Sequence, residues 1–220
     1  MKRRCCLVLI VLLALSYVSS APVVGVCSSR ASGPQETRGK IDGWARENYE
    51  LALDLVLPDG CEAGKDVRWI VCIRIVPGHP SDLEYSLSVE KRYGGTIFAH
   101  ITRPKSQSVY MQLCKEKKKH PGASVGDLTK LIELESQTGD QGRFPGLAGL
   151  ADEFEKVRFS PVLSDEITMD ATQYNLCVKS ISGEQMRLTL YGPGSTAAHQ
   201  PETIIQWTES ARSMLGSAFK

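Results

Sequence analysis

The segment VRWIVCIRIV, residues 67–76, decides the fold because its residues alternate as in a half-buried β-strand. Successive side chains of a strand point to opposite faces, so every second residue of this segment shares one face. The opposite face is mixed, because it carries arginines as well as Ile70 and Cys72. A strand of this kind needs paired neighbours and an apolar layer above it. The face that we expect to be buried consists of Val67, Trp69, Val71, Ile73 and Ile75.

Two hairpins are predicted to supply the neighbouring strands. Residues 84–91 and 96–102 alternate and are joined by Gly94-Gly95, which favours a tight turn. Near the C-terminus, residues 174–178 and 186–190 alternate on either side of Ser182-Gly183-Glu184.

The segment before the central strand is ambiguous. Residues 49–55 alternate, and Pro58-Asp59-Gly60 would turn them toward the central strand, so we predict a strand there. A helix across 44–55 is the alternative, since its Ala, Glu and Leu residues favour one.

Helical patterns occupy the middle of the chain and its end. Ser106 or Ser108 is placed to cap a helix through residues 109–119, and Ser124 is placed to cap a second. A third helix is predicted to start at Pro145, and a last one covers 201–215. The order of these elements predicts an α+β fold, in which a mostly antiparallel sheet of about four N-terminal strands and a C-terminal hairpin carries three central helices and one C-terminal helix.

Residues 1–20 have the features of an export signal. Three basic residues precede a short apolar run, and small residues come before Ala21. The run is shorter than the ~20 residues of a membrane-spanning helix, although a retained N-terminal anchor is the alternative. We therefore predict a signal peptide at 1–20, a flexible leader at 21–43 and a single globular domain at 44–220. Lipid anchoring at Cys27 is disfavoured, because a valine stands where a lipoprotein signal needs a small residue.

Charge gives no reason to expect nucleic acid as a partner. The chain has 26 basic and 25 acidic residues, and without the three basic residues of the signal the balance is 23 to 25, a net charge of −2. Neither nucleic acid nor an anionic membrane is attracted by such a balance.

Of the seven cysteines, five remain after signal cleavage. In an oxidising compartment they predict two disulfides, with Cys27 in the leader left unpaired. Their connectivity is open, and buried free thiols are the alternative. The candidate disulfide cysteines are Cys61, Cys72, Cys114 and Cys177.

Catalytic and metal-binding motifs are not found. The chain has no Gly-x-Ser-x-Gly and no His-Glu-x-x-His sequence. His100 lies on a predicted strand and would act as an acid or base only beside a carboxylate in a cleft. We therefore prefer the interpretation that His100 is hydrogen-bonded within the sheet. Gly192-Pro193-Gly194-Ser195-Thr196 lacks the donors of a phosphate loop, and the local acids Asp165, Glu166 and Asp170 do not make a catalytic pair. We predict no catalytic, metal or cofactor-binding residues and no cofactor.

A basic patch is the strongest electrostatic feature, and it would face an anionic partner. Most of its lysines also lie where cations offset the carbonyl groups at a helix C-terminus. We therefore prefer a solvated surface over a binding site as the interpretation of this patch. The patch comprises Lys105, Lys115, Lys117, Lys118 and Lys119.

Together these features predict an exported soluble protein, secreted or periplasmic, with a non-catalytic binding role and another extracytoplasmic protein as its partner. The alternatives are a secreted hydrolase with a site assembled from distant residues and a carrier of a small apolar ligand. A pocket that gathers a histidine, a carboxylate and a hydroxyl would favour the hydrolase. A dry cavity between sheet and helices would favour the carrier.

Overall fold

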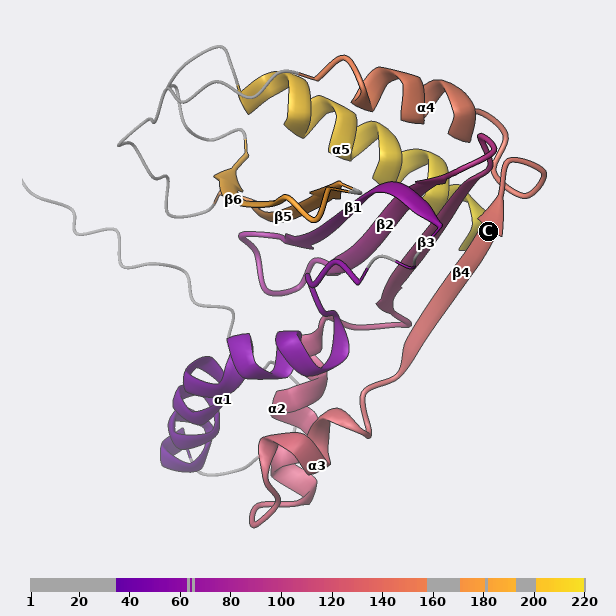
Figure 1. Ribbon diagram of the computed structural model, residues 1–220. Coiled ribbons are helices and arrows are strands. Elements are labelled where there is room, and N and C mark those ends of the chain that lie inside the picture. The colour runs from indigo at the N-terminus through magenta and orange to yellow at the C-terminus, as the bar shows by residue number, and fades with distance from the viewer. Residues whose placement is uncertain are drawn as a thin grey trace, which may run out of the picture.

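The computed structural model describes residues 35–62, 64, 66–157, 171–180, 182–192 and 201–219. In these ranges the chain has an α+β fold, an antiparallel sheet of six strands with helices packed against it (Figure 1). The strands lie in the order β4-β3-β2-β1-β5-β6, with β1 in the interior. They are β1 (Val67–Val76), β2 (Tyr85–Arg92), β3 (Ile97–Pro104), β4 (Leu134–Asp140), β5 (Gln173–Ser180) and β6 (Gln185–Tyr191). The helices are α1 (Gln35–Val56), α2 (Val109–Lys119), α3 (Val125–Thr129), α4 (Leu147–Phe154) and α5 (Pro201–Gly216), followed by the 3-10 turn η1 (Ser217–Phe219).

The main hydrophobic core lies between one face of the sheet and helices α4 and α5 (Figure 1). Trp69 of β1 is in this core, and its ring centroid lies 5.0 Å from that of Phe154 on α4. Phe154 in turn lies 4.9 Å from Trp207 on α5, whose indole N–H donates to the Leu150 carbonyl at 2.7 Å. Each large side chain buried in this way contributes about 1.5–3 kcal/mol. The predicted burial of alternate β1 residues beneath helices is confirmed from Trp69 onward.

Val67 departs from the predicted alternation. The register against β2 shifts between Val67 and Trp69, which leaves Arg68 as an extra residue on β1. Because such a bulge changes the parity of the strand, Val67 packs on the other face, with Cys61 and Ile70. The prediction that Val67 shares the face of Trp69 is therefore wrong.

A second hydrophobic cluster is formed by α1, α2 and α3, and Val76 at the end of β1 joins it. Two serines begin helices in this layer as predicted. The Ser108 hydroxyl accepts from the Met111 N–H at 3.2 Å, and the Ser124 hydroxyl accepts from the Asp127 N–H at 3.2 Å. Of the two serines proposed for α2, Ser108 is the one that caps it.

The predicted strand at 49–55 is wrong, and the helical alternative is correct. Helix α1 covers the whole segment and begins at Gln35, inside the stretch predicted as leader; residues 21–34 lie outside the described ranges. Ala45, Ala52 and Leu53 are buried at helical spacing, whereas Leu51 and Leu55 are 51% and 53% exposed. Packing against α2 and α3 therefore stabilises the helical conformation of this segment over the extended one.

Strand β4 was not predicted. The helix expected from Ser124 ends at Thr129, and β4 begins at Leu134. β4 is an edge strand with the sequence LESQTGD, and its half-buried positions carry Glu135, Gln137 and Gly139, so it has no apolar face. Backbone pairing with β3 holds it, and the sequence pattern carries little trace of that pairing.

Both predicted hairpins are confirmed. Gly94 and Gly95 have φ angles of 89° and 86° between β2 and β3, and Gly183 has a φ of 82° between β5 and β6. These angles lie in the region that glycine adopts without steric cost. No helix within the described ranges is long and apolar enough to cross a membrane.

Candidate functional site

An open cleft of about 740 Å³ lies where β1 leaves the sheet. The loop between β1 and β2 forms one side, and α5 together with the start of β5 forms the other. Its lining combines apolar, aromatic and charged side chains. The lining residues are Ile75, Pro77, Ser81, Asp82, Leu83, Tyr85, Thr172, Tyr174, Ile205, Gln206, Glu209 and Arg212.

On the α5 side, Glu209 is held from two directions. The Tyr174 hydroxyl donates to its Oε1 at 2.8 Å, and the Arg212 guanidinium forms an ion pair with its Oε2. The Arg212 guanidinium carbon also lies 5.5 Å from the centroid of the Tyr85 ring. Burial, with a smaller effect from the Glu209 carboxylate, raises the pKa of Tyr174, so its hydroxyl remains a hydrogen-bond donor at neutral pH.

On the loop side, three neighbouring polar residues contact one another. The Ser81 hydroxyl lies 2.6 Å from Nδ1 of His79 and 3.3 Å from Oδ1 of Asp82. The loop is attached to α2, because the Ser108 hydroxyl donates to the Pro80 carbonyl at 2.5 Å. Our sequence reasoning missed this group, although the short spacing His79-x-Ser81-Asp82 was available as a signal.

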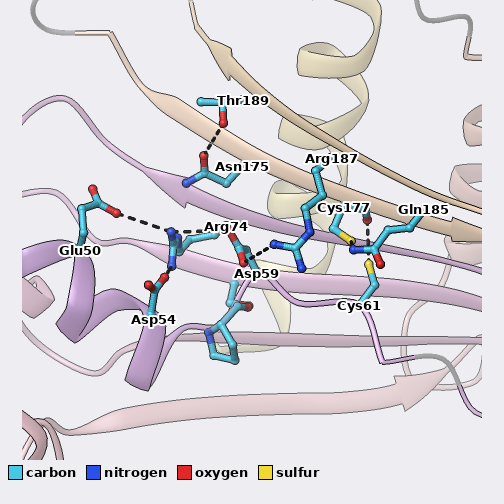
Figure 2. A network of polar contacts seen from close by, with 12 residues as sticks. Glu50, Asp54, Asp59, Cys61, Arg74, Asn175, Cys177, Gln185, Arg187 and Thr189 are labelled. Atoms are coloured by element: carbon cyan, nitrogen blue, oxygen red, sulfur yellow. Dashed lines mark hydrogen bonds and ion pairs between the residues drawn. The ribbon is translucent and has the colours of Figure 1, made fainter.

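A polar network lies on the sheet face opposite α4 and α5, and Figure 2 shows it around Arg74. Arg74 on β1 is only 4% exposed. Its guanidinium lies 2.5 Å from Asp54 and 3.6 Å from Glu50, both on α1, and 3.6 Å from Asp59 in the following loop. This one buried cation thus connects the helical layer and the loop to the sheet. Arg187 of β6 reaches the same Asp59 at 3.9 Å.

Three cysteines meet beside this network, and we call Cys61, Cys72 and Cys177 the thiol cluster. Figure 2 shows two of them, Cys61 and Cys177. The Cys61 thiol donates to the Cys177 carbonyl at 2.9 Å, and the Gln185 amide donates to the Cys177 sulfur at 3.2 Å. Hydrogen bonding to Cys72 and burial raise the pKa of Cys61, and burial raises that of Cys177. The thiols of Cys61 and Cys177 therefore remain protonated at neutral pH.

The predicted pairing of four cysteines into two disulfides is wrong for this structure, because the three members of the thiol cluster are free. The fourth candidate, Cys114, lies on α2 in the other hydrophobic cluster and is bonded to none of them. The two groups belong to different hydrophobic clusters on the same side of the sheet, since the thiol cluster packs on β1 and β5 and Cys114 packs among α1, α2 and α3.

His100 lies on β3, away from the cleft. Its Nδ1 is 2.5 Å from the Thr138 hydroxyl and its Nε2 is 2.8 Å from the Thr102 hydroxyl. Burial lowers its pKa, which favours the neutral imidazole. With a threonine on each ring nitrogen, His100 has the contacts of a sheet histidine rather than those of an acid or base facing a substrate.

The predicted basic patch divides between two places. Lys105 follows β3, and the others lie on the last turns of α2, as expected for cations near a helix C-terminus. The ammonium of Lys117 lies 4.2 Å from the Trp44 ring centroid and donates to the Ala123 carbonyl at 3.0 Å, and Lys119 pairs with Glu116 at 2.7 Å. Lys115 and Lys118 are on the same helix and complete the patch.

Two groups considered in the sequence cannot be placed. Asp165, Glu166 and Asp170, and the glycine-rich stretch after Gly192, lie outside the described ranges. In the part of the chain that the structure describes, no group of three His, Cys, Asp or Glu side chains is arranged to hold a metal ion. Comparison with protein-family models, with curated proteins and with solved structures finds no match.

Proposed function

We propose that the protein is an exported, non-catalytic binding protein, and that the cleft beside α5 binds a small organic cation. The observation that carries this proposal is the carboxylate of Asp82, which lines an open cleft and has no ion pair with any of the described residues. Export is supported by the basic and apolar pattern of residues 1–20.

The charges of the cleft favour a positively charged ligand. Glu209 is already neutralised by Arg212 and accepts from Tyr174. Asp82 has no ion pair with any of the described residues, and only the Ser81 hydroxyl contacts its carboxylate. An ammonium group in the cleft would pair with the Asp82 carboxylate.

The shape of the cleft favours a small polar ligand over an enclosed apolar one. Its volume of about 740 Å³ falls within the range of small-molecule sites, roughly 300–1,000 Å³. An apolar carrier needs a dry cavity, whereas this cleft is open and is lined by charged groups such as Asp82, Glu209 and Arg212.

Thermal unfolding with choline and putrescine as probes tests the proposal, with succinate as the anionic comparison. A probe that binds only the folded protein, at ten times its Kd, stabilises it by about 1.4 kcal/mol, which raises the Tm of a domain of this size by about 3 °C or more. We expect a saturable rise with the cations and none with succinate.

The matched variants are Asp82→Asn and Asp66→Asn. Asp66 is exposed at the opposite end of β1, so its replacement removes the same charge outside the cleft. Asp82→Asn should abolish the rise and Asp66→Asn should keep it. Equal shifts in both variants, or no shift with either cation in the wild type, would refute a cation site at Asp82.

One observation favours the hydrolase as a second candidate. Ser81 lines the cleft, and its hydroxyl lies 2.6 Å from a histidine nitrogen, the arrangement of a nucleophile with its base. The same nitrogen lies 3.4 Å from the Ser81 N–H, as in a turn closed by a side chain. Hydrolysis of p-nitrophenyl acetate that is lost in Ser81→Ala would establish the enzyme, and equal rates in wild type and Ser81→Ala would exclude Ser81 as a nucleophile.

A further inference from the structure

The thiol cluster brings together three parts of the chain that are distant in sequence. Cys61 lies in the segment between α1 and β1, and Cys72 and Cys177 lie directly opposite each other on β1 and β5. All three are at most 8% exposed and share a small cluster with Val67 and Ile70. Figure 2 shows Cys61 beside Cys177 and Gln185, close to the Arg74 network.

The two strand cysteines are poorly placed to bond to each other. Directly opposed residues of an antiparallel pair keep their Cβ atoms about 4.5–5.5 Å apart, whereas a disulfide needs about 3.5–4.5 Å. Both strands are also interior, with β1 paired to β2 and β5, and β5 paired to β1 and β6. A shift that closes the gap would therefore break backbone hydrogen bonds on both sides.

Cys61 is not limited in this way. It lies outside any helix or strand, so its backbone can move without loss of ladder hydrogen bonds. Its thiol already donates to the Cys177 carbonyl at 2.9 Å, and after burial it is the largest cause of the raised pKa of Cys177. Its own strongest thiol neighbour is Cys72. Cys61 is thus the member that lies within reach of both others.

We propose that Cys61 is the obligate member of a disulfide that this cluster forms with a disulfide oxidant, with Cys72 or Cys177 as its partner. Cys61 first loses its proton to solvent, and the thiolate formed in this way attacks a sulfur of the oxidant and releases one thiol. The thiolate of the partner cysteine then attacks the Cys61 sulfur and releases the second thiol. The protein loses two protons and two electrons, the oxidant is reduced to two thiols, and the third cysteine keeps its proton. This inference does not rest on the cation site.

The bridge would also fix the loop that contacts the Arg74 network. Asp59, two residues before Cys61, pairs with Arg74 and Arg187. A bond from Cys61 to either strand therefore holds this carboxylate over the buried guanidinium. Because a cross-link restricts the unfolded chain, we expect the oxidised protein to melt about 5 °C or more above the reduced one.

The experiment is oxidation of the full chain with oxidised glutathione, then alkylation of remaining thiols, digestion without reductant and mass spectrometry. The variants are Cys61→Ser, Cys72→Ser and Cys177→Ser. We expect Cys61 in a bridge in the wild type and in both strand variants, and two alkylated strand cysteines in Cys61→Ser. A bridge between Cys72 and Cys177, or full alkylation of Cys61 after oxidation of the wild type, would overturn the proposal. If a variant does not fold, the disulfide-linked and alkylated cysteines identified in the wild type are enough to test the proposal.

Discussion

At the scale of single residues, Glu84 is the buried charge with the clearest consequence. It is 1% exposed, and its carboxylate accepts from the Tyr49 hydroxyl at 2.5 Å and from the Val109 N–H at 2.9 Å. It thus joins α1 to the first turn of α2. Burial raises its pKa above the usual glutamate value of about 4.5, although both hydrogen bonds oppose that shift. Burial is the larger effect, because the side chain has almost no contact with water.

This raised pKa predicts a pH dependence with a definite sign. The folded state binds the Glu84 proton more tightly than the unfolded state, so stability rises as protons are added. The contribution is complete below about pH 4.5 and is lost as pH rises through the folded pKa. Urea unfolding of wild type and Glu84→Gln from pH 4 to pH 7 isolates it, because other carboxylates cancel in the difference. We expect the advantage of the wild type to shrink with rising pH, and an advantage that grows would contradict the shift.

At the scale of elements, strands with an apolar face could be predicted and the others could not. β1, β2, β3, β5 and β6 were found because alternation or a glycine turn marked them. The alternation of Leu51, Leu53 and Leu55 was misleading, since only Leu53 is buried in the helix that they share. β4 carries no apolar alternation, and it is held by backbone pairing with β3. Backbone groups are the same in every sequence, so this pairing leaves no signal from which the strand could be predicted.

The candidate site was less predictable than the fold for a similar reason. Tyr174 and Glu209 lie on different elements, and their hydrogen bond depends on how α5 packs against β5. The mixed face of β1 was predicted, but the burial of Arg74 depends on carboxylates from α1. Only the local group of His79, Ser81 and Asp82 could have been read from sequence spacing.

The two N-cap serines provide a matched test of packing at helix ends. Ser108 is fully buried and its hydroxyl both donates to Pro80 and accepts from Met111, whereas Ser124 makes its cap bond at an exposed site. Replacing a capping serine by alanine costs about 0.5–2 kcal/mol. We expect the loss of stability in Ser108→Ala to be near or above the upper end of this range and the loss in Ser124→Ala to be near its lower end, because the first replacement also leaves the half-buried Pro80 carbonyl without its donor. Equal losses in urea unfolding would show that the Pro80 bond contributes nothing.

At the scale of the whole molecule, two hydrophobic clusters lie on opposite sides of one sheet. The larger one joins the sheet to α4 and α5, and the smaller one consists of α1, α2 and α3 with Val76 as its residue from β1. Arg74 and its carboxylates provide a polar link between the helical layer and the sheet. A layer joined to the sheet by one apolar residue, one ion network and the hydrogen bonds of Glu84 can open while the sheet remains folded.

Hydrogen–deuterium exchange measured by mass spectrometry tests this division with two core variants. Leu113 and Ile73 are both fully buried, the first in the helical layer and the second in the sheet core, and truncation to alanine costs about 2–5 kcal/mol at such sites. We expect Leu113→Ala to accelerate exchange in α1, α2 and α3 and to leave β1 and β5 protected. Ile73→Ala should accelerate exchange in both layers, because the sheet supports the helical layer. If Leu113→Ala accelerated exchange in β1 and β5 as much as in α1, the two clusters would form one cooperative unit, and the polar link at Arg74 would couple them more strongly than its exposed carboxylates suggest.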